Sequence, residues 1–402
     1  MLKPAEAKQK FMSSLGLLLV IVLWPLLSGI IAGVLSYIGF ESLDLITLIL
    51  AVIWLALFIW FIVMLWKIAP EVGVTPWAFL WIFLPVVGVF LIGMLFLEPL
   101  KYIADNKPAN ERLPLTWDLI KQSWKDFFAS LKTTINTSIY YLYIGLALGV
   151  SGALVGIWAP WGIGHFLLAI ASMLASIWIS IKLFYVVWRI DDNKSPKGDE
   201  QQLATQQLWP YIGVVLLVAL ITAGPFLLIL LVGGMFALSS LLPLLGGTGA
   251  EMTAMIDNLQ ANMNVLLGGG IVFALLLIAS WVWMIYKSVQ YSQAIPALLA
   301  DAKSGYQALK ESARIVKNRW WGMLWKNQLW GLIVGAATFA LLMAAGLVLA
   351  IPLFFLRSTG YAGVANEVLS QALQGGVQML LMPLTFVFII KLYKAFKKTA
   401  GK

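Results

Sequence analysis

Basic and aromatic side chains are interleaved in one short stretch of the chain, and this combination could bind phosphate groups. Within residues 304–326 it brings together Lys310, Arg314, Lys317, Arg319, Trp320 and Trp321, with Lys326 following. A Lys or Arg near a membrane surface gains ~1 kcal/mol from anionic headgroups, and Trp favours the membrane–water interface. Lys121 and Lys125 stand in a comparable stretch, residues 115–132. We therefore predict that these side chains contact anionic lipid headgroups or a membrane partner; the alternative is that their charge only follows membrane topology.

Three further polar residues stand within or at the ends of apolar runs: Lys182, Lys287 and Gln290. A Lys at the centre of a membrane helix costs ~2.5–3.5 kcal/mol on insertion scales, so such residues are functional candidates. Lys182 either extends its stem toward the headgroups beyond Arg189 or contacts a lipid phosphate or substrate. Lys287 and Gln290 either bond across helices or line a vestibule.

No residue set of an enzyme or metal site is found in the sequence. The chain has no cysteine and one histidine, His165, without an acid or second imidazole nearby in sequence. A Ser nucleophile elbow and a phosphate-cradling Gly-Lys-Ser/Thr loop are also absent. We therefore predict no catalytic, cofactor-binding or metal-ligating residues, and a protein that is not an enzyme.

Composition places the chain in a membrane. Of its 402 residues 61% are hydrophobic and 11% charged, too few charges to cover a soluble globule. A helix crossing the ~30 Å hydrocarbon core needs ~20 mostly apolar residues. Nine stretches approach this length: 15–40, 45–66, 77–97, 133–158, 161–188, 210–240, 264–286, 327–356 and 368–390. The predicted fold is all-α and integral to the membrane, a polytopic bundle of eight or nine hydrophobic segments.

The distribution of Lys and Arg predicts the orientation of these segments. The stretches 98–132, 189–209, 287–326 and 391–402 hold nearly all of them, which places these stretches and the C-terminus in the cytoplasm. The basic N-terminus then requires an even number of crossings before residue 98. Either segment 77–97 is re-entrant, turning at Pro85–Gly88, or nine segments cross and the N-terminus lies outside.

Internal repetition predicts the domain organisation. From residue 115 the chain reads as three units of a cytoplasmic amphipathic helix followed by a transmembrane hairpin: 115–188, 199–293 and 303–392. Together they form a repeat membrane domain, 115–392. It is preceded by an accessory membrane module, 1–100, and a polar linker, 101–114, and followed by a basic tail, 393–402.

Part of this domain resembles a known family. The stretches Ala294–Asp301 and Ser304–Ser312, followed by Arg319-Trp320-Trp321, resemble the membrane domain attached to some bacterial glycerophosphodiester phosphodiesterases and related stand-alone multi-pass proteins of unknown function. The resemblance covers about 115–392. It implies a helical repeat domain in the membrane and no defined catalytic or binding residues, and the soluble phosphodiesterase barrel is absent.

These observations favour a non-enzymatic, multi-pass protein of a prokaryotic cytoplasmic membrane, which contacts anionic lipid or a membrane partner through cytoplasmic amphipathic helices. Nucleic acid is a poor partner, because membrane topology explains the net charge of +9. The alternative is a transporter or channel for a lipid or amphiphilic solute, with the repeats as moving units. An intramembrane enzyme is the weakest reading.

Overall fold

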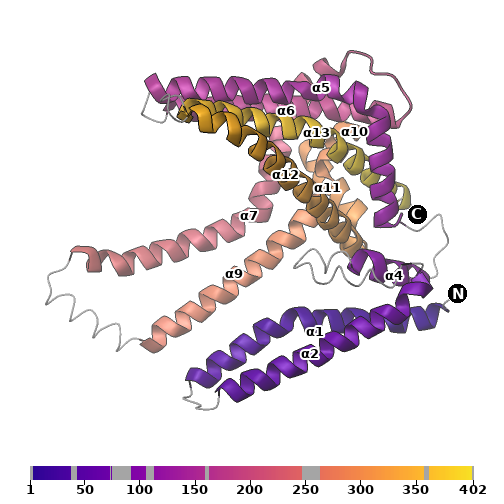
Figure 1. The fold of residues 1–402 in the computed structure, drawn as a ribbon, viewed down its shortest axis with the longest axis vertical. Coiled ribbons are helices and arrows are strands. Elements are labelled where there is room, and N and C mark those ends of the chain that lie inside the picture. The colour runs from indigo at the N-terminus through magenta and orange to yellow at the C-terminus, as the bar shows by residue number, and fades with distance from the viewer. Residues whose placement is uncertain are drawn as a thin grey trace. The chain divides into compact units, whose positions relative to one another are not determined.

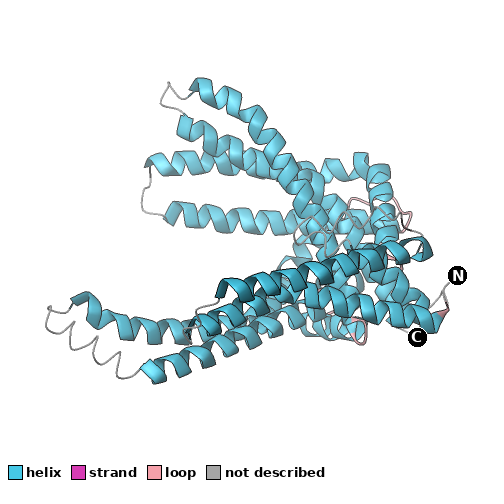
Figure 2. Cartoon of the chain, turned by 60° about the horizontal axis from the view of Figure 1, so that its bottom comes forward, coloured by secondary structure: helices cyan, strands magenta, loops and turns pink. Residues whose placement is uncertain are grey.

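The computed structural model describes residues 3–37, 43–72, 74, 92–105, 113–158, 163–246, 263–356 and 362–400. These residues are helical almost throughout, with no strand among them (Figures 1 and 2). The helices are α1 Pro4–Tyr37, α2 Leu43–Ile68, η1 Ala69–Val72, η3 Gly93–Leu97, α4 Glu98–Asp105, α5 Thr116–Trp158, α6 Ile163–Asp191, α7 Glu200–Gly246, α9 Met263–Tyr291, α10 Ala294–Asp301, α11 Gly305–Val316, α12 Trp320–Leu356 and α13 Ala362–Ala400.

Six of these helices contain stretches long and apolar enough to cross a membrane, counting the described residues alone: Ile49–Val72, Phe166–Asp191, Glu200–Met235, Val272–Asp301, Trp320–Leu349 and Gly363–Ala400. Each corresponds to one of the nine predicted segments. The all-helical fold predicted from composition is therefore confirmed, and the six helices are compatible with a multi-pass membrane protein. The total of eight or nine segments stays a prediction, and the proposed re-entrant turn at Pro85–Gly88 lies outside the described residues.

The chain divides into two compact units, Met1–Ile135 with Leu324–Lys402, and Asn136–Met323. The boundaries fall inside α5 and α12, whereas two of the sequence-based boundaries, 100/101 and 392/393, fall inside α4 and α13. That earlier division into an accessory module and three repeat units stays a prediction.

In the first unit, α1 and α2 form an antiparallel hairpin that also packs on α4. Indole groups bond across it, because Trp54 Nε1–H donates to the Ile21 carbonyl oxygen at 3.2 Å. At the hairpin base Lys10 Nζ lies 2.7 Å from Glu71 Oε1, and this carboxylate raises the pKa of Lys10. Elsewhere in this unit α12 and α13 meet through Trp330 and Phe388, whose rings stack with centroids 4.2 Å apart.

Lys326 of α12 corrects one sequence-based interpretation. It was placed on the lipid-facing surface, but its side chain is only 1% exposed and bonds to Glu98 of α4 and to the Thr116 hydroxyl. The charge is buried because these two partners supply acceptors that lipid tails cannot. Lys326 therefore belongs to the interior of this unit.

In the second unit, α6 packs on α7, and α7 forms a hairpin with α9 (Figure 1). Arg189 at the end of α6 pairs with Asp199 and Glu200 at the start of α7, which closes the turn between the two helices. Trp283 Nε1–H donates to the Ile221 carbonyl oxygen at 3.1 Å and joins α9 to α7. The short helices α10 and α11 then pack on α7 and α9.

The amphipathic stretches take two forms. Residues 115–132 form one continuous helix with the following apolar run, since α5 extends from Thr116 to Trp158, and α7 likewise continues through Pro210. In contrast, α11 ends at Val316 and α12 begins at Trp320. Asn318 between them has φ +65°, a left-handed conformation that Asn tolerates better than most residues and that ends α11.

Candidate functional site

A polar staple positions α11 against the end of α9. The Ser312 hydroxyl of α11 donates to the Gln290 carbonyl oxygen at 2.8 Å and accepts the Gln293 N–H at 3.1 Å. Gln290 and Gln293 flank the turn where α9 gives way to α10, so one buried hydroxyl satisfies two backbone groups that this turn leaves unpaired. The staple fixes which face of α11 is buried and which is presented outward.

Spacing along α11 then sorts its side chains. The buried residues Ala308, Leu309, Ser312, Ile315 and Val316 recur at spacings of three, four and seven positions, as one face of an amphipathic helix requires. The opposite face presents Lys310, Arg314 and Lys317, all exposed. At its start the Ser304 N–H donates to Gln307 Oε1 at 3.4 Å, as in a capping box.

The aromatic step after α11 is fixed to α9. Trp320 Nε1–H donates to the Tyr286 carbonyl oxygen at 3.0 Å, and the two rings stack with centroids 5.8 Å apart. Trp321 stands edge-on to Trp320 and is 62% exposed. The start of α12 therefore lies against the end of α9, with Trp321 on the outside.

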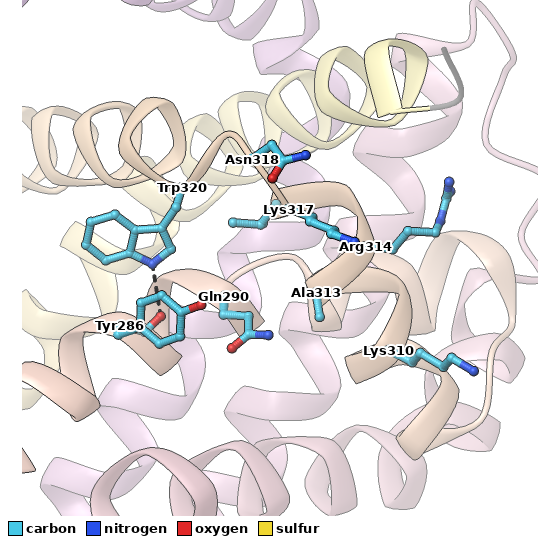
Figure 3. Close-up of a pocket in the computed structure, with 9 residues that line it drawn as sticks. Tyr286, Gln290, Lys310, Ala313, Arg314, Lys317, Asn318 and Trp320 are labelled. Carbon is cyan, nitrogen blue, oxygen red and sulfur yellow. Dashed lines mark hydrogen bonds between the residues drawn. The ribbon is translucent and has the colours of Figure 1, made fainter.

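These contacts enclose a surface hollow of about 490 Å³ between the end of α9, α11 and the start of α12. Figure 3 shows the stacked Tyr286 and Trp320 on one side and Lys310 and Arg314 on the other. The lining residues are Tyr286, Gln290, Lys310, Ala313, Arg314, Val316, Lys317, Asn318 and Trp320. The lining thus contains three cations, two amide side chains and an aromatic pair, and no carboxylate.

The three cations are not equivalent. Arg314 forms a bidentate pair with Glu311, at 2.7 Å and 3.0 Å, and Lys303 lies 3.6 Å from the same carboxylate. Glu311 is only 9% exposed because these two cations fold over it. Lys310 and Lys317 have no carboxylate partner in the part of the chain that is described, so they carry the unbalanced positive charge of the hollow.

The structure brings five of the predicted residues to this hollow: Lys310, Arg314, Lys317, Trp320 and Gln290. Arg319 adjoins it in sequence without lining it, and burial lowers the pKa of its guanidinium. Lys287 follows the lining residue Tyr286 in the sequence but does not itself line the hollow. Its Nζ lies 2.9 Å from Gln290 Oε1 and 4.7 Å from the Trp283 ring centroid.

The remaining predicted residues lie elsewhere. Lys121 and Lys125 are exposed on α5 in the first unit, with Lys121 Nζ 5.4 Å from the Trp117 ring centroid. Lys182 of α6 does not extend toward Arg189. Its Nζ folds back toward Trp178, one turn earlier, and lies 5.0 Å from the Tyr140 ring centroid.

Of the four lining residues that were not predicted as site residues, Ala313 and Val316 are apolar, whereas Tyr286 and Asn318 carry polar groups; the contacts of Ser312 were not predicted either. Tyr286 directly precedes the predicted Lys287, and Asn318 stands in the break between α11 and α12. A signal existed for Ser312, a small hydroxyl on the otherwise apolar face of the amphipathic helix. Buried hydroxyls of this kind bond to backbone groups.

Chemically, the hollow has the donors to hold an anion. Ammonium and guanidinium donors suit phosphate oxygens, and the amide of Gln290 can add a further donor. Over the described ranges no three His, Cys, Asp or Glu side chains group as metal ligands would. Comparison of the chain with protein-family models, with curated proteins and with solved structures finds no match.

Proposed function

We propose that this protein is a multi-pass membrane protein that binds the phosphate of anionic lipid headgroups in the hollow between α9, α11 and α12. The observation that carries the proposal is that Lys310, Arg314 and Lys317 all line one hollow, whose lining has no carboxylate. Its role is non-enzymatic: to hold or organise lipid, or a partner that presents the same phosphate chemistry, at the predicted cytoplasmic surface.

The surroundings of the hollow support a lipid over a soluble anion. The cations lie next to helices whose apolar stretches, Val272–Asp301 and Trp320–Leu349, are suited to a membrane. Trp320 and Trp321 stand at the start of the second stretch, where amphipathic rings favour the interface. A headgroup bound there would keep its acyl chains beside apolar side chains.

The test uses the full chain in nanodiscs that contain either phosphatidylglycerol with phosphatidylcholine or phosphatidylcholine alone. Native mass spectrometry counts the lipids that remain bound. The double variant Lys310→Ala/Lys317→Ala should bind phosphatidylglycerol roughly 30-fold more weakly, taking ~1 kcal/mol for each near-surface cation.

A matched control removes the same charge elsewhere. Lys194 and Lys197 are exposed in the turn between α6 and α7, on the same predicted side of the membrane. Lys194→Ala/Lys197→Ala should leave phosphatidylglycerol binding within about twofold. Equal losses from the two double variants would show that net charge, and not the hollow, attracts the lipid.

A second experiment, on the same protein in liposomes, distinguishes the proposed headgroup-binding scaffold from the alternative, a transporter of lipid or an amphiphile. A headgroup-binding scaffold should leave the rate at which labelled phospholipid changes leaflet equal to that of protein-free vesicles. Protein-dependent movement that the Lys310→Ala/Lys317→Ala variant abolishes would favour the transporter.

A further inference from the structure

Three helices share a lysine placed after a long apolar run. α6, α9 and α13 are the second helices of the three predicted hairpins, and the first lysine in each is Lys182, Lys287 and Lys391, respectively. Aromatic residues stand within four positions of each lysine: Trp178, Trp283 and Phe388. The three lysines thus occupy corresponding places in the three hairpins.

The partners of these lysines differ. Lys391 is mostly buried, and its Nζ lies 2.5 Å from Asp126 Oδ2 of α5. Lys287 donates to Gln290 Oε1 at 2.9 Å. Lys182 has neither a carboxylate nor a hydrogen-bond acceptor within the described part of the chain; its Nζ faces two rings, 5.0 Å from the Tyr140 centroid and 5.6 Å from that of Trp178.

Ring faces alone do not complete the surroundings of Lys182. A cation–π contact attracts the ammonium, but a ring face does not accept its three N–H donors as oxygen atoms do. Lys182 lies inside the apolar stretch Phe166–Asp191, seven residues before Arg189, where charged side chains pair with another charge or with oxygen atoms. The Lys391–Asp126 pair shows that the corresponding lysine in α13 is neutralised by an anion.

We propose that Lys182, with Tyr140 and Trp178, forms a second site that binds the phosphodiester of a bilayer phospholipid. The phosphate oxygens accept from Lys182 Nζ, and the two rings fix the position of the ammonium. This site is independent of the hollow on α11, because none of its residues lines that hollow.

The exposed surface beside the site identifies a lipid as the source of the phosphate. From Tyr140 onward the exposed side chains of α5 are apolar or aromatic and fall on one stripe, at Tyr143, Leu146 and Val150. Acyl chains can lie along such a stripe. A free phosphate ion would gain nothing from it and would have to enter an apolar stretch without its hydration shell.

The experiment titrates the full-length protein in detergent with phosphatidylglycerol and counts retained lipids by native mass spectrometry. Lys182→Met removes the charge and keeps most of the stem, and Lys182→Arg keeps the charge. Lys182→Met should lose one retained lipid and bind it about tenfold more weakly, whereas Lys182→Arg should stay within about threefold of the wild type. Lys182→Gln provides a second neutral variant in case Lys182→Met does not fold.

Two further probes identify the ligand. Diacylglycerol has the same chains without a phosphate and should not occupy the site. Inorganic phosphate alone, at millimolar concentration, should not raise the unfolding temperature of the protein in a manner that depends on Lys182. The proposal is overturned if the neutral variants retain as many lipids as the wild type, if diacylglycerol binds equally well, or if inorganic phosphate alone gives the Lys182-dependent shift.

The two proposed sites can be tested independently. Lys310→Ala/Lys317→Ala should remove a different bound lipid, so its combination with Lys182→Met should lose both. If Lys182→Met retains as many lipids as the wild type while Lys310→Ala/Lys317→Ala loses one, the second site is rejected and the proposed function stands.

Discussion

Lys326 Nζ lies 2.5 Å from Glu98 Oε1, although the two residues are 228 positions apart in the chain. The second oxygen of the Glu98 carboxylate accepts the Thr116 N–H at 2.9 Å, and the Thr116 hydroxyl lies 3.0 Å from Lys326 Nζ. One carboxylate therefore joins the start of α4, the start of α5 and the first turns of α12. Close by, the Trp325 ring packs on Gly93 of η3, where an added Cβ would come within 3.0 Å of the ring.

Removing one member of this buried pair should be strongly destabilising. Lys326→Met leaves the Glu98 carboxylate without its cation, and loss of one partner of a buried ion pair costs about 3–5 kcal/mol. The expected result is a lower midpoint of thermal unfolding in detergent, followed by near-ultraviolet circular dichroism.

Two variants show whether the effect comes from the pair. The double variant Lys326→Met/Glu98→Met removes both charges and should recover most of the loss, because no uncompensated ion remains. Lys125→Met removes an exposed lysine of α5 and should change stability by less than about 0.5 kcal/mol. A Lys326→Met variant as stable as Lys125→Met would contradict the structural role given to the pair.

Salt should weaken lipid binding at the α11 hollow. Lys310 and Lys317 are exposed, so their attraction for a phosphate is screened as the Debye length falls from about 10 Å at 0.1 M salt to about 3 Å at 1 M. Retention of phosphatidylglycerol by the wild type should therefore fall over this range, measured by lipid exchange between nanodiscs. The Lys310→Ala/Lys317→Ala variant should show a clearly shallower dependence; equal slopes would mean that the two lysines do not contribute.

Acid should loosen the turn between α6 and α7. Arg189 Nη1 lies 2.5 Å from Asp199 Oδ1, and this hydrogen-bonded guanidinium lowers the pKa of Asp199. The contribution of the pair is thus fully present above the unfolded-state pKa of Asp, about 3.9, and is lost as the pH falls through the lower folded-state value. The Leu203 amide bonds to the Asp199 carbonyl oxygen. Its hydrogen-exchange protection factor, which corrects for the intrinsic exchange rate, should therefore decrease as the pH falls from the unfolded-state pKa of Asp199 to the folded-state pKa.

The matched variant is Asp199→Asn, which cannot titrate. It should show weaker protection at neutral pH and a flatter response to acid. An acid response identical to that of the wild type would assign the change to another group.

Helical periodicity and the membrane character were predictable because both depend on local patterns. The grouping of Lys310, Arg314 and Lys317 also follows from spacing along one helix. Contacts between distant segments were not predictable in this way. Lys326 lies in the same basic and aromatic stretch, 304–326, as the exposed residues Lys310 and Lys317. It is buried because it pairs with Glu98, which lies far away in the sequence. Tyr286 joins the hollow because α9 and α12 meet there, which no pattern within either helix indicates.

Close packing of α7 against α9 should make two adjacent glycines respond differently to the same substitution. A Cβ at Gly233 would lie 2.1 Å from Cε2 and 2.4 Å from Cζ of Phe273, whereas a Cβ at Gly234 would meet nothing within 4 Å. Gly233→Ala should therefore lower stability by about 1–3 kcal/mol, the usual cost of overpacking. Gly234→Ala should be neutral or slightly stabilising, since Ala favours a helix by up to ~1 kcal/mol over Gly. Thermal unfolding in detergent measures both.

The control removes the group that clashes. Because a Cβ at Gly233 would meet Phe273, Phe273→Ala should remove most of the stability difference between Gly233→Ala and Gly234→Ala. If the difference persists when Phe273 is Ala, the cost of Gly233→Ala comes from another contact.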